Sequence, residues 1–527
     1  MTKRSRRIAP VLLVTALLVG SCAPVRPRLD PTPSLNTTTE LLRADALVRA
    51  GCYNCLRQAL TVYESLAAAP APAPAAAWRA VDTAILMATR ERELGLGRGT
   101  SRQAAAELAE RLPAPFDYSP YLAMVDAIGW TRTGVSAEQQ DTILAAQRSV
   151  NQHFSEWRVT LLATAVSDPM SAYELLSLDC LYTYRLREAK QTTWPLPTGA
   201  PPLLRYRSAI CANASSDLVD VTLRDEPRLR ELHLWLGERA LGRGTLRTAE
   251  RHMLTALEEI PELMAAHLLL GDIYLAMEDV ESAFTEYHAV ATAVPGQRDA
   301  MLGEAKTLSY LDRHQEAIAV LDEMVRLGTW FQGEAHYWLG VNRYGLRQYD
   351  ATNDEVAAAR RFIPMDPLVD KLAGMTALAR QEIEQAEREF RTAIEHFAGR
   401  QVKDCESGYL LASVLVMQKK WTEGGQRFTE AVPCYVSSEQ AAHRKIDEIN
   451  ASALTADRKA RLVAGKEKLI AALQSLQARA AYNGAVAYAN LGDKERARPL
   501  AERATQHPDM AEQAQKLLAL LREKAGT

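Results

Sequence analysis

The sequence of 527 residues lacks the motifs of the common enzyme classes. It contains no G-x-S-x-G nucleophile turn, no H-E-x-x-H zinc motif and no G-x-x-x-x-G-K-[ST] phosphate loop. The glycine-rich stretch 95–99 follows a predicted helix rather than a strand, so it does not fit a dinucleotide-binding turn. We therefore predict no catalytic residues and no cofactor, and we do not expect the protein to be an enzyme.

Clustered positive charge, long apolar runs and aromatic residues are also scarce. The net charge is −3 and the chain has no basic block, which argues against nucleic acid as a partner because phosphate binding needs clustered Lys and Arg. Aromatic residues make up only 6%, and β-branched residues are scattered among abundant alanine, leucine, glutamate and arginine. This balance favours helices over sheets, so we predict an all-α protein.

The N-terminus has the pattern of an export signal. Basic residues precede an apolar run, 11–19, which is too short to span a bilayer. Gly20 and Ser21 stand directly before Cys22, and this arrangement resembles the lipobox of bacterial lipoproteins. The resemblance implies that residues 1–21 are removed and that Cys22 is lipidated. An ordinary signal peptide with a nearby free thiol is the alternative.

The residues after Cys22 bear on where the protein is held. Ala23 rather than aspartate follows the cysteine, which in lipoproteins favours the outer membrane over retention in the inner membrane. We therefore expect a lipid-anchored protein on the periplasmic face of the outer membrane, with exposure on the cell surface as an alternative. Residues 22–39 are rich in Pro, Ser and Thr and predict a flexible tether.

The six other cysteines form an even set, as expected in an oxidising compartment. Their proximity in the sequence predicts three disulfides, although other pairings are possible: Cys52 with Cys55, Cys180 with Cys211, and Cys405 with Cys434. The first pair is a C-x-x-C motif, which can be a redox centre. No βαβ pattern surrounds it, so we interpret it as a disulfide that closes a turn. No second thiol pair completes a zinc site, and no metal is predicted.

A pattern with a period of 34 residues runs through the middle of the chain. In its clearest copy, 264–295, Gly271 and Ala283 supply small side chains where two antiparallel helices approach, and Tyr274 and Tyr287 fill the space beside them. Equivalent residues recur one period earlier and one period later. Such a period indicates a helical solenoid, and the pattern resembles the tetratricopeptide repeat (TPR) family.

The repeats set the predicted domain organisation. Copies register near residues 230, 264, 298, 333, 367 and 405, so the array is expected at 230–434. Residues 40–225 predict an N-terminal helical domain with one degenerate repeat, and residues 435–527 predict two bridging helices, a last repeat-like pair and a capping helix. The predicted fold is an all-α helical-repeat solenoid of TPR-like helix-turn-helix pairs with an additional N-terminal helical domain.

In TPR proteins the first helix of each repeat lines a concave groove that binds a protein or peptide. Carried over by repeat position, the resemblance implies these groove residues: Leu234, Glu238, Asp272, Lys306, Tyr310, Tyr337, Tyr344 and Tyr409. The equivalent positions also include Glu231, Leu268, Asp299, Glu334 and Met375. Tyrosines are effective anchors because they bury a large area and keep a hydroxyl donor. Alternatively, these residues form only a solvated inner face, or they pack against the protein's own N-terminal domain.

Three histidines, His233, His267 and His336, occupy equivalent positions in separate repeats, and we interpret them as packing residues rather than metal ligands. The leading hypothesis is a non-catalytic, lipid-anchored TPR scaffold that binds a protein or peptide partner of the bacterial cell envelope. One alternative is a surface lipoprotein that captures nutrients or glycans, although the tryptophans form no cluster in the sequence. Another is an enzyme within 40–225, or a thiol-redox protein that uses Cys52 and Cys55.

Overall fold

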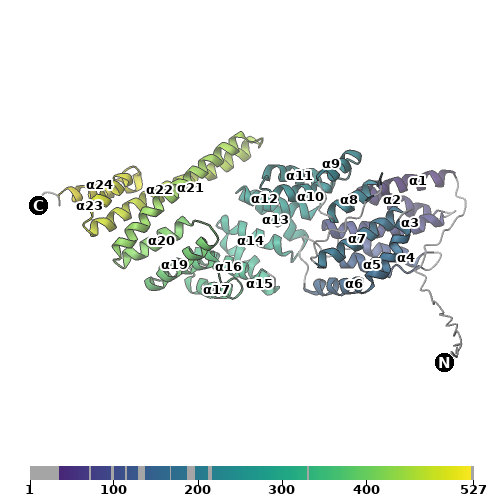
Figure 1. Cartoon of the computed structure of the whole chain (residues 1–527), viewed down its shortest axis with the longest axis horizontal. Coiled ribbons are helices and arrows are strands. Elements are labelled where there is room, and N and C mark those ends of the chain that lie inside the picture. Colours follow the sequence, from purple (N-terminus) through teal and green to yellow (C-terminus); the bar gives the residue numbers. More distant parts are fainter. Residues whose placement is uncertain are drawn as a thin grey trace, which may run out of the picture. The chain divides into compact units, whose positions relative to one another are not determined.

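A computed structural model describes most of the chain after the expected tether. The described residues are 35–69, 73–96, 100–112, 116–128, 137–165, 168–186, 196, 198–211, 216–328 and 331–523. The expected signal segment and Cys22 lie outside this part. These residues form 24 α-helices and no strand, which confirms the predicted all-α class (Figure 1). None of their helices is long and apolar enough to cross a membrane.

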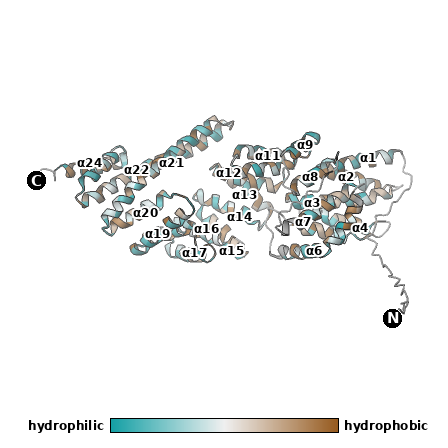
Figure 2. Ribbon diagram, in the orientation of Figure 1, coloured by the Kyte–Doolittle hydropathy of each residue, from teal (hydrophilic) through white to brown (hydrophobic). Residues whose placement is uncertain are grey.

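The chain divides into two compact units. Unit 1 comprises Met1–Gly129 and Gln140–Leu232, and unit 2 comprises Trp130–Gln139 and His233–Thr527. Within each unit, apolar and polar residues alternate around most helices, as Figure 2 shows, so each helix buries one side and exposes the other.

Unit 1 consists of helices that range from 9 to 29 residues in length. They are α1 (Leu35–Ala50), α2 (Tyr53–Ala67), α3 (Pro74–Leu94), α4 (Thr100–Glu110), α5 (Ser119–Ala127), α6 (Ala137–Ala165), α7 (Pro169–Leu186), α8 (Pro202–Cys211) and α9 (Ser216–Asp225). α1 begins at Leu35, so residues 35–39 of the expected tether are helical. α3 packs on α2 and α4 and is buried along most of its length, which makes it the centre of this unit.

The α1–α2 turn is fixed by a close approach to α8. Gly51 has a φ of 73°, a conformation that favours glycine, and a Cβ placed on it would lie 2.7 Å from the Cα of Leu203. Cys52 caps α2, because its sulfur accepts the N–H of Cys55. The turn at Gly51, Cys52 and Tyr53 therefore lies where the degenerate repeat predicts it.

Unit 2 is an array of antiparallel helix pairs. The first helices of the pairs are α10 (Leu232–Gly242), α12 (Met264–Ala276), α14 (Arg298–Tyr310), α16 (Gln332–Gly345), α18 (Pro367–Ala379) and α20 (Cys405–Met417). The second helices are α11 (Leu246–Glu259), α13 (Val280–Ala293), α15 (His314–Arg326), α17 (Tyr349–Phe362), α19 (Ile383–Gly399) and α21 (Trp421–Ala451). From α11 to α21 each helix packs on the next one in the chain, and Gly237 on α10 lies against Met253 on α11, as in a solenoid.

The turn between the two helices is built the same way in every repeat. One residue takes the left-handed conformation that ends many helices, and it recurs along the array: Gly244, Glu278, Asp312, Arg347, Gln381 and Lys419. The next N–H then donates to a carbonyl five residues earlier, as from Asp279 to Tyr274 at 2.8 Å. The repeat is therefore present in the backbone as well as in the side chains.

The C-terminal part departs from the prediction in its helix boundaries. A helix end was expected near Pro433, followed by two separate bridging helices, but α21 continues through Pro433 to Ala451. Proline removes one hydrogen bond from the ladder. Buried Val432 and Tyr435, and the disulfide from Cys434 to Cys405 on α20, hold the helix on both sides of the proline.

The second expected bridging helix likewise merges with the last repeat. α22 (Ala456–Asn490) is continuous and packs along α21, so the two helices form a long hairpin. The C-terminal part of α22 then packs on α23 (Lys494–Ala504), and α24 (Pro508–Glu523) is the last helix of the array. In Figure 1 the tip of the hairpin projects away from α23 and α24.

Candidate functional site

The predicted groove residues begin in the first repeat of the array, where they are partly covered. Leu234 on α10 is buried, and Glu238 on the same helix is half-buried. Glu231 was expected on the groove, but its side chain is buried in unit 1, where it meets Arg90. The assignment of Glu231 to the groove is therefore wrong. The repeat register indicates which face of a helix a residue lies on, but it does not show which neighbouring segments cover that face.

The next first helices carry charged groove residues that bond to neighbouring helices. Asp272 on α12 is exposed and accepts the hydroxyl of Tyr287 at 2.6 Å. Lys306 on α14 donates to Glu334 on α16 at 3.2 Å, an ion pair between adjacent repeats. Burial raises the pKa of Asp299 above its usual value. The charges on this face are therefore mostly engaged in holding adjacent helices together.

Three predicted tyrosines gather with a tryptophan on α14 and α16. Tyr310 is 57% exposed and meets Trp338 edge to face, with the ring centres 5.5 Å apart. Tyr337 contacts the same tryptophan at 5.3 Å, and Tyr344 meets Tyr349 at 5.6 Å. We call Tyr310, Tyr337, Trp338 and Tyr344 the aromatic patch. Trp338 was missing from the prediction, because adjacent residues of a helix point in different directions and the repeat position assigned the groove to Tyr337.

The hydroxyls of the patch remain protonated donors. Burial raises the pKa of Tyr337, and Tyr310, Asp366 and Glu406 nearby raise it further. Burial likewise raises the pKa of Tyr344, with Tyr349 and Glu406 as further causes. A neutral tyrosine pairs an apolar ring with one O–H donor, which suits contact with a peptide backbone.

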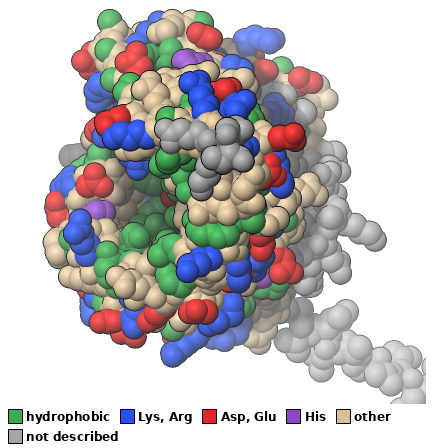
Figure 3. Space-filling model, turned by 90° about the vertical axis from the view of Figure 1, so that its left-hand side faces the viewer, with side chains coloured by type: hydrophobic (Ala, Val, Ile, Leu, Met, Phe, Trp, Pro, Cys, Tyr) green, Lys and Arg blue, Asp and Glu red, His purple; other side chains and the backbone are tan. Residues whose placement is uncertain are grey.

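The patch continues toward α18 and α20. Lys371 on α18 donates to Glu406 at 2.9 Å and lies 3.5 Å from Asp404. Tyr409 on α20 is half-buried and packs edge to face on Phe428 and Tyr435, with ring centres 5.4 Å and 6.2 Å away. Tyr409 therefore belongs more to the core of the sixth repeat than to the exposed patch. Figure 3 shows a hollow with hydrophobic side chains on its floor and charged side chains around it.

The three equivalent histidines bond within their repeats. His267 meets Glu286 at 2.6 Å and His336 meets Glu355 at 2.7 Å, both across the two helices of one repeat. His233 meets His252 at the corresponding place, with the two Nδ1 atoms 2.9 Å apart. Within the described part of the chain, no group of three or more His, Cys, Asp and Glu side chains is placed to hold a metal ion. The histidines connect helices, as the packing interpretation implies.

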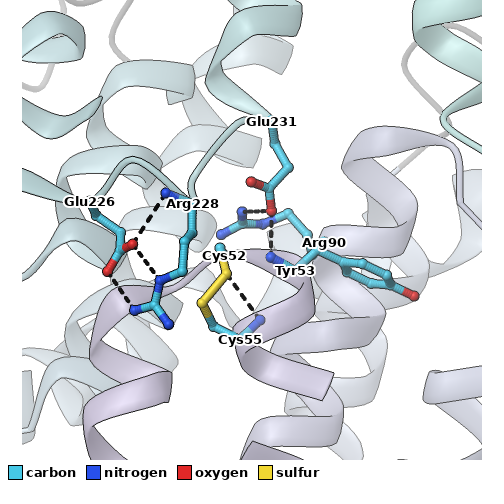
Figure 4. The surroundings of a disulfide bond; sticks show 7 residues. All are labelled: Cys52, Tyr53, Cys55, Arg90, Glu226, Arg228 and Glu231. Atoms are coloured by element: carbon cyan, nitrogen blue, oxygen red, sulfur yellow. Dashed lines mark hydrogen bonds and ion pairs between the residues drawn. A yellow bond between two sulfur atoms is a disulfide. The ribbon is translucent and has the colours of Figure 1, made fainter. Parts of the chain in front are cut away.

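The Cys52–Cys55 pair forms a disulfide at the start of α2 (Figure 4). Both cysteines are only 2% exposed, so a substrate disulfide cannot reach either sulfur without local opening. Glu231 lies beside them, where its carboxylate accepts the N–H of Tyr53 and pairs with Arg90 at 3.3 Å. This burial favours a structural disulfide over a redox centre.

The other two predicted disulfides have different outcomes. Cys405 and Cys434 are bonded and join α20 to α21, which confirms that pair. The side chain of Cys211 lies outside the described residues, so its pairing with Cys180 stays a prediction.

Unit 1 also contains a cavity that sequence reasoning missed. It has a volume of about 480 Å³ and lies between the start of α5 and the middle of α6. Its walls include Phe116, Tyr121, and the stacked rings of His153 and Trp157, whose centres are 5.2 Å apart. The aromatic residues come from segments that are distant in the sequence, which is why no cluster was visible there. None of the predicted groove residues lines this cavity.

The repeated turn and the helix pairs of unit 2 decide the fold. Unit 2 is a helical-repeat solenoid of TPR-like helix-turn-helix pairs. No protein-family model matches the sequence, and no curated protein matches it. Unit 1 supplies the additional N-terminal helices, so the predicted fold class is confirmed.

Several solved structures are similar to parts of the chain. A tetratricopeptide repeat protein from Parabacteroides merdae is 15% identical, with 56% of this chain and 98% of that one covered and a TM-score of 0.34. MamA from Desulfovibrio magneticus is 18% identical, with coverage of 32% and 96% and a TM-score of 0.30. PilW, a type IV pilus biogenesis factor, is 15% identical, with coverage of 38% and 91% and a TM-score of 0.35.

Proposed function

We propose that the protein is a non-catalytic scaffold that binds a segment of a protein partner on the aromatic patch. The observation that carries this proposal is the exposure of a large aromatic side chain, Tyr310, beside Trp338 on the first helices of adjacent repeats. Exposed aromatic rings held rigidly by neighbours are typical anchors of peptide and protein interfaces. The half-buried Tyr337 and Tyr344 extend the same surface.

The chemistry of the patch indicates what the partner presents. The rings offer apolar area and neutral O–H donors, and the nearby cations Lys306 and Lys371 are already paired with Glu334 and Glu406. A partner segment with apolar or aromatic side chains and free backbone carbonyls would match these groups. A strongly acidic segment would have to compete with the existing ion pairs, so it is disfavoured.

The proposed location is the bacterial cell envelope, with the scaffold held by a lipidated Cys22 on the periplasmic face of the outer membrane. The support is the lipobox-like sequence before Cys22, together with the even number of other cysteines. Metabolic labelling with a radioactive fatty acid in a bacterial host tests the anchor. Label should enter the wild type and be lost in C22A, and label that persists in C22A would refute lipidation at this residue.

Binding by the patch is tested with a library of linear peptides displayed on phage and selected on the immobilised protein. The variant Y310A removes the most exposed ring. F362A serves as a matched control, because Phe362 is 56% exposed at the end of a second helix, α17. Selected peptides should bind Y310A about tenfold more weakly and F362A unchanged, as expected for loss of one interface anchor. Equal binding to wild type and Y310A would overturn the assignment.

A further inference from the structure

The α21–α22 hairpin reaches back to the beginning of the array. α21 starts as the second helix of the sixth repeat, but with 31 residues it is about twice as long as the other second helices, such as the 14-residue α13. α22 returns along it. The start of α22 then contacts α11, α12 and the α12–α13 turn, from which it is separated by 179 to 208 residues in the sequence.

Arg458, near the start of α22, makes the central contact. Its guanidinium bonds to Glu250 on α11 and to Asp279 in the α12–α13 turn, the latter at 2.6 Å. It also stacks over the ring of Tyr274, 4.5 Å from the ring centre. Burial alone would lower the pKa of Arg458, but its bonds to Glu250 and Asp279 raise it by more, so the group stays charged. A planar guanidinium held by two carboxylates and a ring is a specific docking contact.

Two more cations of the hairpin complete the contact. Lys466 is buried and pairs with Glu278, the left-handed residue of the α12–α13 turn. Arg461 lies 3.9 Å from Asp279. All the positive charges in these pairs come from the hairpin, and all the negative charges come from α11 and the α12–α13 turn. We call Glu250, Glu278 and Asp279 the acidic socket.

These contacts close unit 2 on itself. The helices from α12 to α20 form a continuous packed series. The α21–α22 hairpin follows α20, and the start of α22 contacts the end of α12 and the turn after it. We infer that the hairpin is a clasp that joins the ends of this series into a ring around the inner face, so that the partner is an extended peptide segment admitted when the clasp opens. This inference rests on the proposed binding by the aromatic patch.

The clasp has the properties of a contact that can open. It depends on a few charge pairs, and the pair of Lys466 with Glu278 has an exposed carboxylate, where salt can weaken it. The rest of the hairpin is two helices packed on each other, which keep their own contact when the tip is released. Because closure hinders passage in both directions, opening should speed binding and release together and change the affinity little.

Charge exchange across one pair tests the clasp. K466E places two acids together and should release the tip, E278K should do the same with two cations, and the double variant K466E/E278K should restore the pair. K468E is the matched control, because Lys468 is exposed on the same helix and makes the same change of charge. Circular dichroism confirms that each variant is folded.

Two measurements are made on each variant. Hydrogen exchange at residues 455–466 should rise about tenfold or more in K466E and E278K, and it should return to the wild-type rate in the double variant. For a peptide selected on the wild type, the association and dissociation rates should both rise about tenfold in K466E, with a similar Kd. K468E should match the wild type in both measurements.

The outcomes separate this inference from the proposed function. Unchanged exchange and unchanged rates in K466E would overturn the clasp, even if peptides still bind through Tyr310. Rates that stay raised in the double variant would also overturn it, because they would show a general disturbance of α22. If the selected peptides bind Y310A and wild type equally, the aromatic patch is wrong, whereas the exchange result still decides whether the hairpin is docked on the acidic socket.

Discussion

The ring of Tyr287 occupies the space that a side chain at Gly271 would need. A Cβ on Gly271 would lie 2.6 Å from this ring, which is closer than real Cβ atoms come to other groups. The ring cannot move away easily, because it also lies against Gly303 of the next repeat. In addition, the hydroxyl of Tyr287 donates to Asp272 at 2.6 Å. Tyr287 is therefore a spacer that sets the distance between α12, α13 and α14.

Replacement of Gly271 by alanine should destabilise unit 2. Alanine improves helix propensity by about 1 kcal/mol, but overpacking against a fixed ring costs about 1–3 kcal/mol, so we expect a net loss of up to about 2 kcal/mol. Urea unfolding followed by circular dichroism measures the change. A variant as stable as the wild type would mean that the ring shifts freely.

Gly465 provides the matched control for that substitution. It lies within α22, and a Cβ placed on it would meet no atom within 4 Å. G465A should therefore gain the helix propensity without a clash and raise the stability by about 0.5–1 kcal/mol. Opposite signs for G271A and G465A would show that contact with Tyr287, rather than helix propensity, decides the effect.

The sequence predicted those parts of the fold that repeat. Gly271, Ala283 and Tyr287 recur at fixed spacing because every helix pair meets the same packing requirement, and that requirement is visible in a single chain. The turn at 277–280 was predicted for the same reason, and α12 ends and α13 begins there.

Contacts that occur once in the molecule were not predictable in this way. Lys466 and Glu278 are separated by 188 residues and belong to no repeat pattern. Pro433 normally ends a helix, but here buried neighbours and a disulfide keep α21 continuous, and local rules do not include such tertiary support. For the candidate site, Tyr310 is exposed at the position that the repeat register gave, and its role in binding stays a prediction, whereas the register did not reveal that Leu234 is covered.

The His267–Glu286 pair should make unit 2 more stable at mildly acidic pH. The hydrogen bond to Glu286 raises the pKa of His267, against an opposing effect of burial. A raised folded-state pKa means that the extra stability is fully present below the unfolded pKa of about 6.5 and is lost as pH rises through the folded pKa. Relative to H267Q, the wild type should be more stable by at most about 1 kcal/mol at mildly acidic pH, because solvent partly screens the pair, and the difference should shrink as pH rises.

Other titrating groups shift both proteins equally, so the comparison with H267Q isolates the pair. Urea midpoints across a pH series measure the difference. H443Q is a suitable control, because His443 is exposed on α21 and lies 3.8 Å from the nearest oxygen of Glu439. A difference between wild type and H267Q that grows as pH rises would contradict the assigned direction.

The Cys405–Cys434 disulfide should contribute more stability than Cys52–Cys55. It joins residues 29 apart, whereas the other joins residues three apart, and a longer closed loop restricts the unfolded chain more. C405S/C434S should lose about 2–4 kcal/mol. C52S/C55S should lose less, since a serine hydroxyl at position 52 can still accept the N–H of residue 55 as a helix cap. Thermal unfolding of the two double variants ranks them, and the reverse order would contradict the loop-length argument.

Removal of one partner of the buried Arg90–Glu231 pair should destabilise unit 1 much more than removal of both partners together. Both side chains are fully buried in unit 1, where Glu93 pairs with Arg207 and also lies 3.7 Å from Arg90. E231Q leaves Arg90 charged without its nearest acid, and it should lower the stability by about 3–5 kcal/mol. R90M/E231M removes both charges together and should cost much less, because Glu93 and Arg207 stay paired. Urea unfolding of both variants decides, and a double variant at least as unstable as E231Q would mean that the ion pair itself is what stabilises unit 1.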